Sequence, residues 1–310
     1  KHVQAHPPLP KLLKEKGYLS FQTGKWWEGN HKLGGFTSGM THGDPKRGGR
    51  HGDLGLKISR TGHQPIENFL DECGDKPFFI WHAPFLPHTP HNPPARLMQK
   101  YTKDGRSKFV ARYFAMCDWF DETCGDLLKI LDDRKLSENT LVVYVTDNGW
   151  IQSEDSGRYA PRSKRSPNEG GTRTPTMLRW PGKIAPKEYE TLVSSIDLAP
   201  TILAACELES PEEMPGVNLL PQVTGGKPID RDAVFGEIFE HDVADIDDPT
   251  ASLLYRWVIE GEWKLIDPHN SADVELYNLK EDPHENKNLA KDNPEIVARL
   301  KKRLDAWWQP

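Results

Sequence analysis

Residues 141–149 read Leu-Val-Val-Tyr-Val-Thr-Asp-Asn-Gly, a short apolar run that ends in two polar side chains and a glycine. Similar runs occur at residues 78–82 and 176–180. Continuous apolar runs of this length are typical of strands that are buried on both faces of a parallel sheet. Helical patterns separate the runs, so we predict an α/β fold: an α/β/α sandwich around a mostly parallel mixed sheet.

The clearest helical pattern places apolar side chains in alternating steps of three and four residues, which is typical of a helix with one buried face. A second helix is predicted to begin at Asp197 as its N-cap, with Pro200 in the first turn. The apolar stripe of the first helix consists of Val110, Tyr113, Cys117, Phe120, Cys124, Leu127 and Leu131.

The start of the chain predicts a helix followed by a strand. Leu9, Leu12 and Leu13 share one face of a short helix that we expect to stop at Gly17, and residues 18–23 read as a strand. A helix that leads into a parallel strand requires an earlier strand on its other side. Because the chain also begins with Lys rather than Met, we expect it to be the C-terminal part of a longer protein.

The composition changes after Cys206 to a stretch rich in Pro, Gly and charge, which is typical of a linker or surface excursion. We therefore predict two domains, residues 1–225 and 226–310. In the second, residues 255–259 and 263–266 read as a hairpin, and residues 276–279 add a strand. Asn293 and Pro294 begin a terminal amphipathic helix, so this domain is expected to be a small antiparallel sheet covered by one helix.

Charge and hydropathy exclude several classes of protein. The 40 Lys and Arg residues against 46 Asp and Glu residues give a net charge of −6, so no bulk positive field exists to hold a nucleic acid. No run approaches the roughly 18 apolar residues of a membrane-spanning helix. The four cysteines form no C-x-x-C pair, and we interpret them as free thiols.

Asp147 and Asn148 stand where the strand at residues 141–145 is predicted to end, and open α/β sheets bind ligands beside such strand ends. A carboxylate next to an amide oxygen offers two hard ligands, which suit Ca²⁺ or Mg²⁺ rather than zinc. The alternative is that Asp-Asn-Gly is only a turn.

Three histidines, His82, His88 and His91, lie along a proline-rich loop that follows the strand at residues 78–82. Imidazoles fixed at a strand end suit general acid catalysis or contact with an anion. The alternatives are a three-histidine zinc site and a structural role for at least one ring.

Several basic side chains lie around a Gly-Gly pair that precedes the strand at residues 176–180. A cluster of positive charges beside glycine suits a site that binds an oxyanion. The alternatives are a solvated loop and a nuclear-localisation or nucleic-acid patch. Lys25 follows the strand predicted at residues 18–23 and is next to Trp26 and Trp27. The basic cluster consists of Arg158, Arg162, Lys164, Arg165 and Arg173.

A parallel sheet brings the C-terminal ends of its strands to one rim. We therefore expect the candidate site residues to meet there. These are Lys25, His88, Asp147, Asn148 and Lys164.

Six segments, in order, resemble the motifs of the sulfatase family, part of the alkaline-phosphatase-like superfamily, over essentially the whole chain. GYLSFQTGKWWEG is similar to the GKWHLG segment, PFFIWHAPFLPHTP to the strand and PHTP loop, and VVYVTDNG to the metal segment. KRSPNEGGTRTPTMLRWPG is similar to the E-G-G-x-R-x-P signature. SSIDLAPTIL with PGVNLLP, and ELYNLKEDPHENKNLA, resemble the later elements.

The resemblance implies hydrolysis of sulfate esters, of a sulfated small molecule or polysaccharide, by a protein exported to the periplasm or outside the cell. It implies that Asp147 and Asn148 are ligands of a divalent cation, usually Ca²⁺. Lys25, His88 and Lys164 would contact the sulfate group. Tryptophans at positions 26, 27, 81 and 150 could stack on sugar rings, although core packing explains them equally well.

Parts of the family pattern are missing from this chain, among them the paired aspartates that complete the family's metal site upstream of its nucleophile. Trp27 takes the place of the GKWH histidine that orients the nucleophile, and His31 or His82 are the candidates to replace it. The nucleophile itself, a formylglycine made in C/S-x-P/A-x-R, has no counterpart here, so we expect it upstream. The alternatives are a phosphodiesterase or phosphonate hydrolase of the same superfamily, and a non-catalytic relative that binds anions or glycans.

We predict that the 310-residue chain alone does not hydrolyse sulfate esters, whereas a version extended upstream through C/S-x-P/A-x-R does. Charge-stabilising groups without a nucleophile cannot support covalent catalysis. Release of sulfate from an aryl sulfate measures the difference. Turnover by the short chain that is lost in Lys164→Ala or Asp147→Ala would instead reveal a nucleophile within it.

Overall fold

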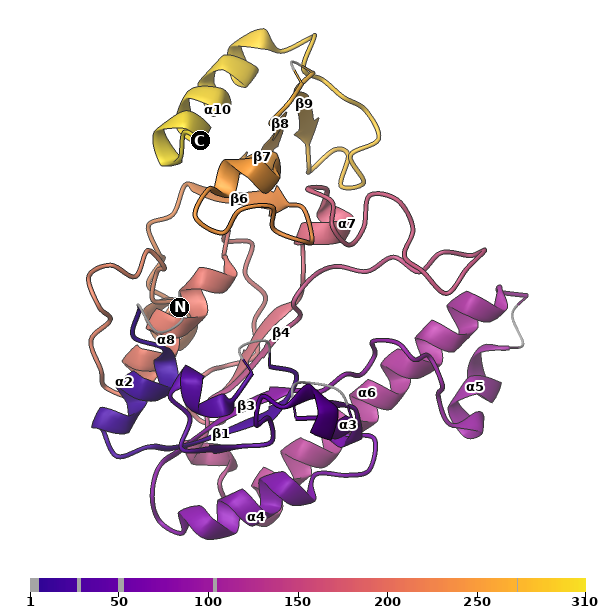
Figure 1. Ribbon diagram of the computed structural model, residues 1–310. Coiled ribbons are helices and arrows are strands. Elements are labelled where there is room, and N and C mark those ends of the chain that lie inside the picture. The colour runs from indigo at the N-terminus through magenta and orange to yellow at the C-terminus, as the bar shows by residue number, and fades with distance from the viewer. Residues whose placement is uncertain (1–5, 27–28, 50–52, 103–104, 272) are drawn as a thin grey trace. The chain divides into compact units, whose positions relative to one another are not determined.

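The computed structural model describes residues 6–26, 29–49, 53–102, 105–271 and 273–310 (Figure 1). The chain packs into two compact units, which we describe separately. The first contains residues 1–141, 180–183 and 199–215, and the second contains residues 142–179, 184–198 and 216–310. The division into domains 1–225 and 226–310 stays a prediction.

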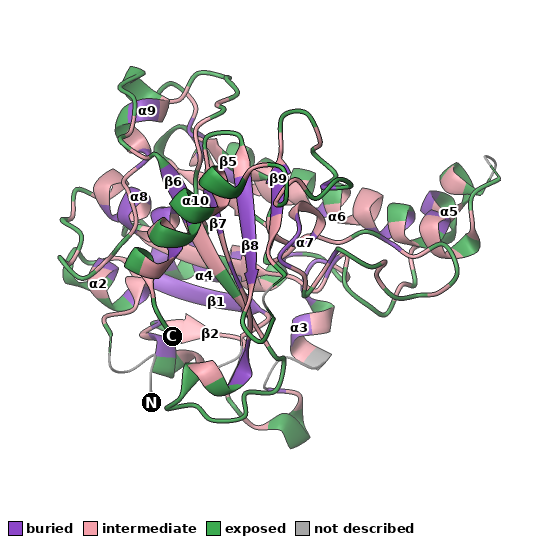
Figure 2. Ribbon diagram, turned by 90° about the horizontal axis from the view of Figure 1, so that it is seen from above, coloured by how far each residue is buried: buried purple, intermediate pink, exposed green. Residues whose placement is uncertain are grey.

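A three-stranded parallel sheet with the order β2-β1-β3 lies in the first unit. β1 (Leu19–Gly24) pairs with β3 (Phe78–Ala83) along its whole length and with the short β2 (Ser38–Gly39). Figure 2 shows β1 buried for most of its length. Its polar side chains can be buried because they are hydrogen-bonded, as where the Gln22 Oε1 accepts the Thr41 N–H at 3.1 Å. The strand predicted at residues 18–23 is confirmed.

Helices surround this sheet. Phe21 of β1 stacks on Phe69 with 5.0 Å between ring centroids, and Leu127 and Ile130 pack against the same cluster. Apolar side chains of β1 and β3 therefore pack against the apolar faces of two helices, at residues 64–73 and 108–133. The helical elements of this unit are α2 (Leu9–Glu15), α3 (Asp53–Lys57), α4 (Gln64–Cys73), α5 (Ala95–Tyr101), α6 (Lys108–Asp133), η1 (His31–Gly34), η2 (Pro45–Arg47), η3 (Ser137–Asn139) and all but the first residue of α8 (Leu198–Ala205).

A chain of polar side chains crosses the same sheet face near the strand ends. The hydroxyl of Thr23 lies 2.7 Å from His82 Nδ1, and Ser59 Oγ lies 3.1 Å from both His82 Nε2 and His63 Nε2. Each hydroxyl can donate one hydrogen and accept another, so the chain satisfies neutral imidazoles. Burial, and secondarily the nearby His63, lowers the pKa of His82 to about 3.

The second unit contains β4 (Val142–Val145) and β5 (Thr176–Arg179), which pair with each other in antiparallel fashion. The apolar runs in the sequence predict that β4, β5 and the strand at residues 78–82 are parallel strands buried on both faces. This prediction is wrong for β5, which is antiparallel to β4. A continuous apolar run reports burial and not strand direction, and even burial is incomplete, because Val145 is 40% and Met177 54% exposed. The short helix α7 (Glu169–Thr172) lies between these two strands in the sequence.

Asp197 has a different role from the predicted N-cap of a helix. Ser194 caps the turn η4 (Ser195–Asp197) that leads into α8, and the carboxylate of Asp197 accepts the Ser194 N–H at 2.7 Å. The same buried carboxylate accepts the Val217 N–H at 2.8 Å and pairs with Arg231. The stretch predicted as a linker or surface excursion is thus anchored at both of these points, and it contains the helix α9 (Leu220–Gly225).

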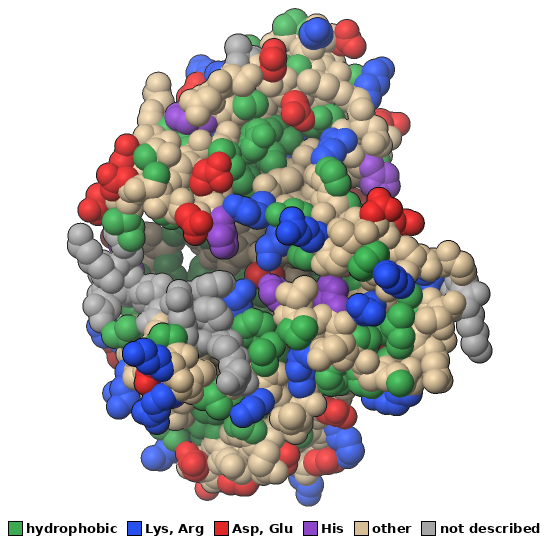
Figure 3. Space-filling view, turned by 45° about the vertical axis from the view of Figure 1, so that its right-hand side comes forward, with side chains coloured by type: hydrophobic (Ala, Val, Ile, Leu, Met, Phe, Trp, Pro, Cys, Tyr) green, Lys and Arg blue, Asp and Glu red, His purple; other side chains and the backbone are tan. Residues whose placement is uncertain are grey.

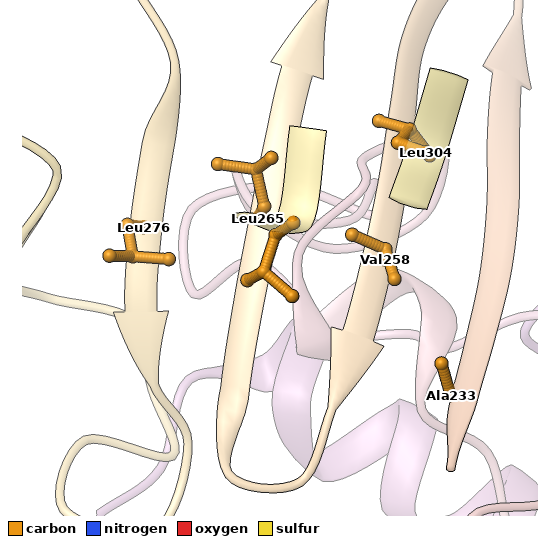
Figure 4. Close-up of a cluster of buried hydrophobic side chains, with 6 residues drawn as sticks. Ala233, Val258, Leu265, Leu276 and Leu304 are labelled. Atoms are coloured by element: carbon orange, nitrogen blue, oxygen red, sulfur yellow. The ribbon is translucent and has the colours of Figure 1, made fainter. Parts of the chain in front are cut away.

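The C-terminal part of the second unit is a four-stranded antiparallel sheet with one helix against it. Its strands, in spatial order, are β6 (Ala233–Phe239), β7 (Leu253–Glu260), β8 (Trp263–Pro268) and β9 (Glu275–Asn278), and the helix is α10 (Pro294–Trp307). Figure 4 shows the shared core, in which Val258 and Leu265 from the sheet meet Leu304 from the helix. The predicted hairpin, third strand and terminal helix are confirmed, as is the α/β class with a separate small antiparallel sheet.

Figure 3 shows acidic and basic side chains interspersed on the face that it draws, without one continuous basic surface there. Among the described residues, no helix combines the length and apolar character needed to cross a bilayer.

We predict that Leu265→Ala lowers the free energy of unfolding by about 2–5 kcal/mol, because it empties a fully buried position between β8 and α10. Urea unfolding followed by circular dichroism measures this loss. Ile246→Ala, at a position that is 65% exposed in the same unit, is the control and should change the free energy by less than about 0.5 kcal/mol. Similar losses in both variants would contradict the assigned core.

We predict that the ring of His82 stays neutral from pH 8 to pH 5, because its folded-state pKa is about 3. The unfolded ring has a pKa of about 6.5, so its contribution to stability is complete above that pH and is lost as the pH falls toward 3. The ring-proton resonance, assigned by its loss in His82→Gln, should not shift over this range. In urea the same resonance should titrate near pH 6.5, and a folded-state midpoint above pH 5 would contradict the buried network.

Candidate active site

Lys25 and His88 both lie near one aromatic ring, that of Phe85, in the first unit. Lys25 directly follows β1, and its N–H donates to the Ala83 carbonyl at 2.7 Å. Its Nζ lies 5.8 Å from the centroid of Phe85, and the His88 ring meets Phe85 edge-on at 5.8 Å. The structure therefore brings these two predicted sulfate-contacting residues to a common neighbour.

His88 is exposed, and its Nδ1 lies 3.0 Å from the carbonyl oxygen of Thr89. The Thr89 hydroxyl lies 3.1 Å from the same nitrogen, so Nδ1 can donate to the carbonyl or accept from the hydroxyl. In the neutral tautomer that donates from Nδ1, the lone pair of the ring lies on Nε2. When His88 is protonated, Nε2 becomes a donor while the bond to Thr89 is kept, which suits contact with an anion or a leaving oxygen.

Arg60 holds the loop that follows His88, a role that sequence reasoning missed. Its guanidinium donates to Asn92 Oδ1 at 2.6 Å and to the Pro90 carbonyl at 3.2 Å, and it lies 5.2 Å from the centroid of the Trp119 ring. Burial lowers the pKa of Arg60. No motif marks this arginine, because it lies 30 residues before the carbonyl that it contacts.

The two candidates to replace the absent family histidine differ in how their rings are bonded. His82 has both ring nitrogens engaged within the Thr23 and Ser59 chain, and its lowered pKa opposes protonation. His31 Nδ1 lies 2.8 Å from the Thr41 carbonyl. Trp27, which occupies the position of the family histidine, lies outside the described residues.

Asp147 and Asn148 follow β4 in the second unit. Asp147 is exposed, and Asn148 is half-buried. The side-chain amide of Asn148 donates to the Gly149 carbonyl at 2.9 Å, so its nitrogen is turned back to the chain and its oxygen remains for a cation. The Gly149 N–H donates to the Gly171 carbonyl at 2.9 Å, which fixes this turn on α7.

Lys164 reaches the same turn region. Its Nζ lies 5.9 Å from the centroid of Trp150, the second residue after Asn148. The neighbouring Ser163 accepts the Ile151 N–H at 2.6 Å. The loop that carries Lys164 and the chain that follows Asp147 and Asn148 are thus bonded to each other.

The donor set of Asp147 and Asn148 fits a hard cation such as Ca²⁺ or Mg²⁺, because both ligands are oxygens. These two oxygens would supply only part of such a site, since Ca²⁺ takes about six to eight oxygens. Among the described residues, no group of three or more His, Cys, Asp or Glu side chains is placed to hold a metal. This finding disfavours the three-histidine zinc site in the described part of the chain.

The five predicted site residues thus fall into two sets. Lys25 and His88 belong to the first unit, and Asp147, Asn148 and Lys164 belong to the second. Their meeting at one sheet rim stays a prediction.

Residues 2–208 match the protein-family model Sulfatase, and residues 157–309 match the model N-sulphoglucosamine sulphohydrolase, C-terminal. The N-acetylgalactosamine-6-O-sulfatase of Bacteroides thetaiotaomicron is 25% identical over 269 residues, 77% of this chain and 49% of that protein. The chain spans about half the length of the curated relatives that it matches.

Two solved structures share the fold. Ps i-CgsB in complex with k-i-k-neocarrahexaose has a TM-score of 0.76 at 23% identity, over 97% of this chain and 74% of that chain. The phosphonate monoester hydrolase of Silicibacter pomeroyi has a TM-score of 0.71 at 18% identity, over 96% and 78%. The fold similarity agrees with the Sulfatase model, which covers well over half of the sequence. As the order of its motifs predicts, the chain belongs to the sulfatase family.

Proposed function

We propose that the whole protein hydrolyses sulfate esters and that this chain supplies the groups that bind and stabilise the sulfate. The observation that carries the proposal is that, in a member of the sulfatase family, the loop of Lys164 is hydrogen-bonded to the chain that directly follows Asp147 and Asn148. A cationic side chain next to two hard oxygen ligands is what the transfer of an anionic group requires.

In this proposal, Lys25 and Lys164 donate to the sulfate oxygens, and His88 donates from Nε2 to the leaving oxygen. Asp147 and Asn148 hold a divalent cation, Ca²⁺ or Mg²⁺. When bound, the cation would offset negative charge on the sulfate oxygens. The chain's own residues thus bind, orient and stabilise the group that is transferred.

The nucleophile is proposed to lie in the part of the protein upstream of this chain, as a formylglycine. The cysteines described here are poorly suited to the role. Burial raises the pKa of all four thiols, and that of Cys124 rises to about 11. A thiol reacts as its thiolate, so these side chains would be weak nucleophiles at neutral pH.

The proposed substrate is a sulfated saccharide. One relative is named for a sulfated amino sugar, and one structural neighbour was solved with a neocarrahexaose. Trp81 is 45% exposed and meets Trp26 edge-on at 6.3 Å, so it offers an aromatic face at the end of β3 to a sugar ring. Because the relatives include bacterial sulfatases, we also propose export to the periplasm or outside the cell.

The alternative activity is hydrolysis of a phosphonate or phosphate diester. The fold similarity to a phosphonate monoester hydrolase favours it, and the same charged residues would serve either anion. The choice of substrate therefore distinguishes the two.

We predict that Lys164→Ala, in a version extended upstream through C/S-x-P/A-x-R, lowers kcat/KM for an aryl sulfate by about 10²- to 10³-fold. Loss of one donor to the developing negative charge has this size. Lys227→Ala, at an exposed position in the same unit, is the control and should keep the wild-type rate. Sulfate release from sulfated galactosamine or carrageenan oligosaccharides tests the substrate class.

An unchanged rate in Lys164→Ala would contradict the role of this lysine. An extended protein that cleaves phosphate diesters or phosphonates far better than sulfates would move the assignment to phosphoryl chemistry. An extended protein with the intact motif that cleaves neither class would favour the non-catalytic binder.

A further inference from the structure

A buried charge cluster lies behind α7 in the second unit. Lys264 of β8 has no exposed surface, and its Nζ donates to Glu169 Oε1 at 2.7 Å. Glu285 Oε1 lies 3.2 Å from the same Nζ, and the Trp257 ring lies 5.4 Å away. Three charges from distant parts of the sequence thus meet away from water.

This cluster constrains geometry more strongly than a surface ion pair. A buried charge is tolerated only when opposite charge and hydrogen bonds surround it, and removal of one partner leaves the others uncompensated. An exposed ion pair in the same unit, such as Lys280 with Glu262 at 2.8 Å, constrains the backbone much less. Lys264 therefore fixes Glu169, the first residue of α7.

Glu285 adds two more contacts to the same region. Its Oε2 accepts the Glu169 N–H at 2.8 Å. Its backbone carbonyl accepts a hydrogen bond from the guanidinium of Arg162, which also lies 5.7 Å from the Tyr277 ring. Glu285 therefore holds both the start of α7 and the loop that carries Lys164.

The loop can lie against α7 because two consecutive helix residues have no side chain. A Cβ on Gly170 would stand 2.5 Å from the Arg162 carbonyl oxygen. A Cβ on Gly171 would stand 2.3 Å from the Ser163 oxygen. The two residues after Glu169 thus approach the backbone of the two residues before Lys164 closely, and the Gly171 carbonyl also accepts the Gly149 N–H.

We propose that Lys264 and Glu285 are positioning residues for the cation- and sulfate-binding groups of the second unit. They act through Glu169, which fixes the position of α7, and through Arg162, which fixes the position of the Lys164 loop. In turn, α7 fixes the position of the Asp147–Asn148 turn. The cation and the sulfate as ligands rest on the proposed function, whereas the structural link from Lys264 to the Asp147–Asn148 turn does not. The C-terminal sheet is therefore part of the site's support.

Hydrogen exchange in the 310-residue chain tests the link. Lys264→Met should speed exchange at the amides of Gly149 and Glu169 by about tenfold or more, because both donate within this arrangement. Lys280→Met is the matched control and should leave both rates unchanged. If Lys264→Met does not fold, Arg162→Gln carries the test, since it removes only the contacts of an exposed side chain and should still loosen the Lys164 loop.

Terbium luminescence sensitised by Trp150 provides a second readout. Weakening of Tb³⁺ binding by about tenfold in Lys264→Met and in Glu285→Gln, but not in Lys280→Met, supports positioning of Asp147 and Asn148, since outer partners of ligands have effects of this size. Unchanged exchange at Gly149 and Glu169 in folded variants would overturn the inference. If the unaltered chain binds no Tb³⁺, the cation proposal fails, while the exchange rates still decide the positioning role.

Discussion

The ammonium group of Lys264 is enclosed by protein, and two carboxylates, those of Glu169 and Glu285, lie within 2.7 and 3.2 Å of it. Breaking such a buried cluster costs about 3–5 kcal/mol, which is a large part of a domain's net stability. The cluster therefore makes one arrangement of β8, α7 and the segment around residue 285 far more stable than others. The exposed Asp147 and the half-buried Lys164 depend on that arrangement, because α7 and Glu285 hold the backbone from which each projects.

The first unit supports its candidate residues by a different kind of bonding. Thr23, His82, Ser59 and His63 form a neutral hydrogen-bonded chain, and Arg60, next to Ser59, holds the loop after His88. Neutral networks avoid the desolvation penalty of buried charges but require every hydroxyl and ring nitrogen to be satisfied. In both units, then, the buried polar groups fix the backbone, while the side chains proposed to meet the substrate lie at the surface or half-buried.

Local patterns in the sequence predicted the elements well wherever local physics decides them. The strand at residues 18–23, the hairpin around Gly261 and the helix after Asn293 are close to the observed bounds. Other features depend on tertiary contacts. In α6 the fully buried positions include Ala111, Ala115 and Met116, none of which belongs to the predicted apolar stripe, because the neighbours that cover a helix decide which of its faces is buried. Lys264 was missed since a single lysine in an alternating strand reads as solvent-facing until its two partners, 95 residues before and 21 after, are known.

The partners of Lys264 lie in two segments whose motifs resemble those of the sulfatase family. The Glu-Gly-Gly segment supplies one carboxylate and two bare backbone positions, and the Asp-Pro-His-Glu segment supplies the second carboxylate that pairs with the same lysine. Neither segment stabilises the fold alone. Without Lys264, the Glu169 carboxylate would lack its compensating charge. Without the Lys164 loop, Gly170 would only lower the stability of the helix. The two motifs are therefore parts of one packing unit, and a site built on it requires both ends of the chain segment from residue 142 to residue 310.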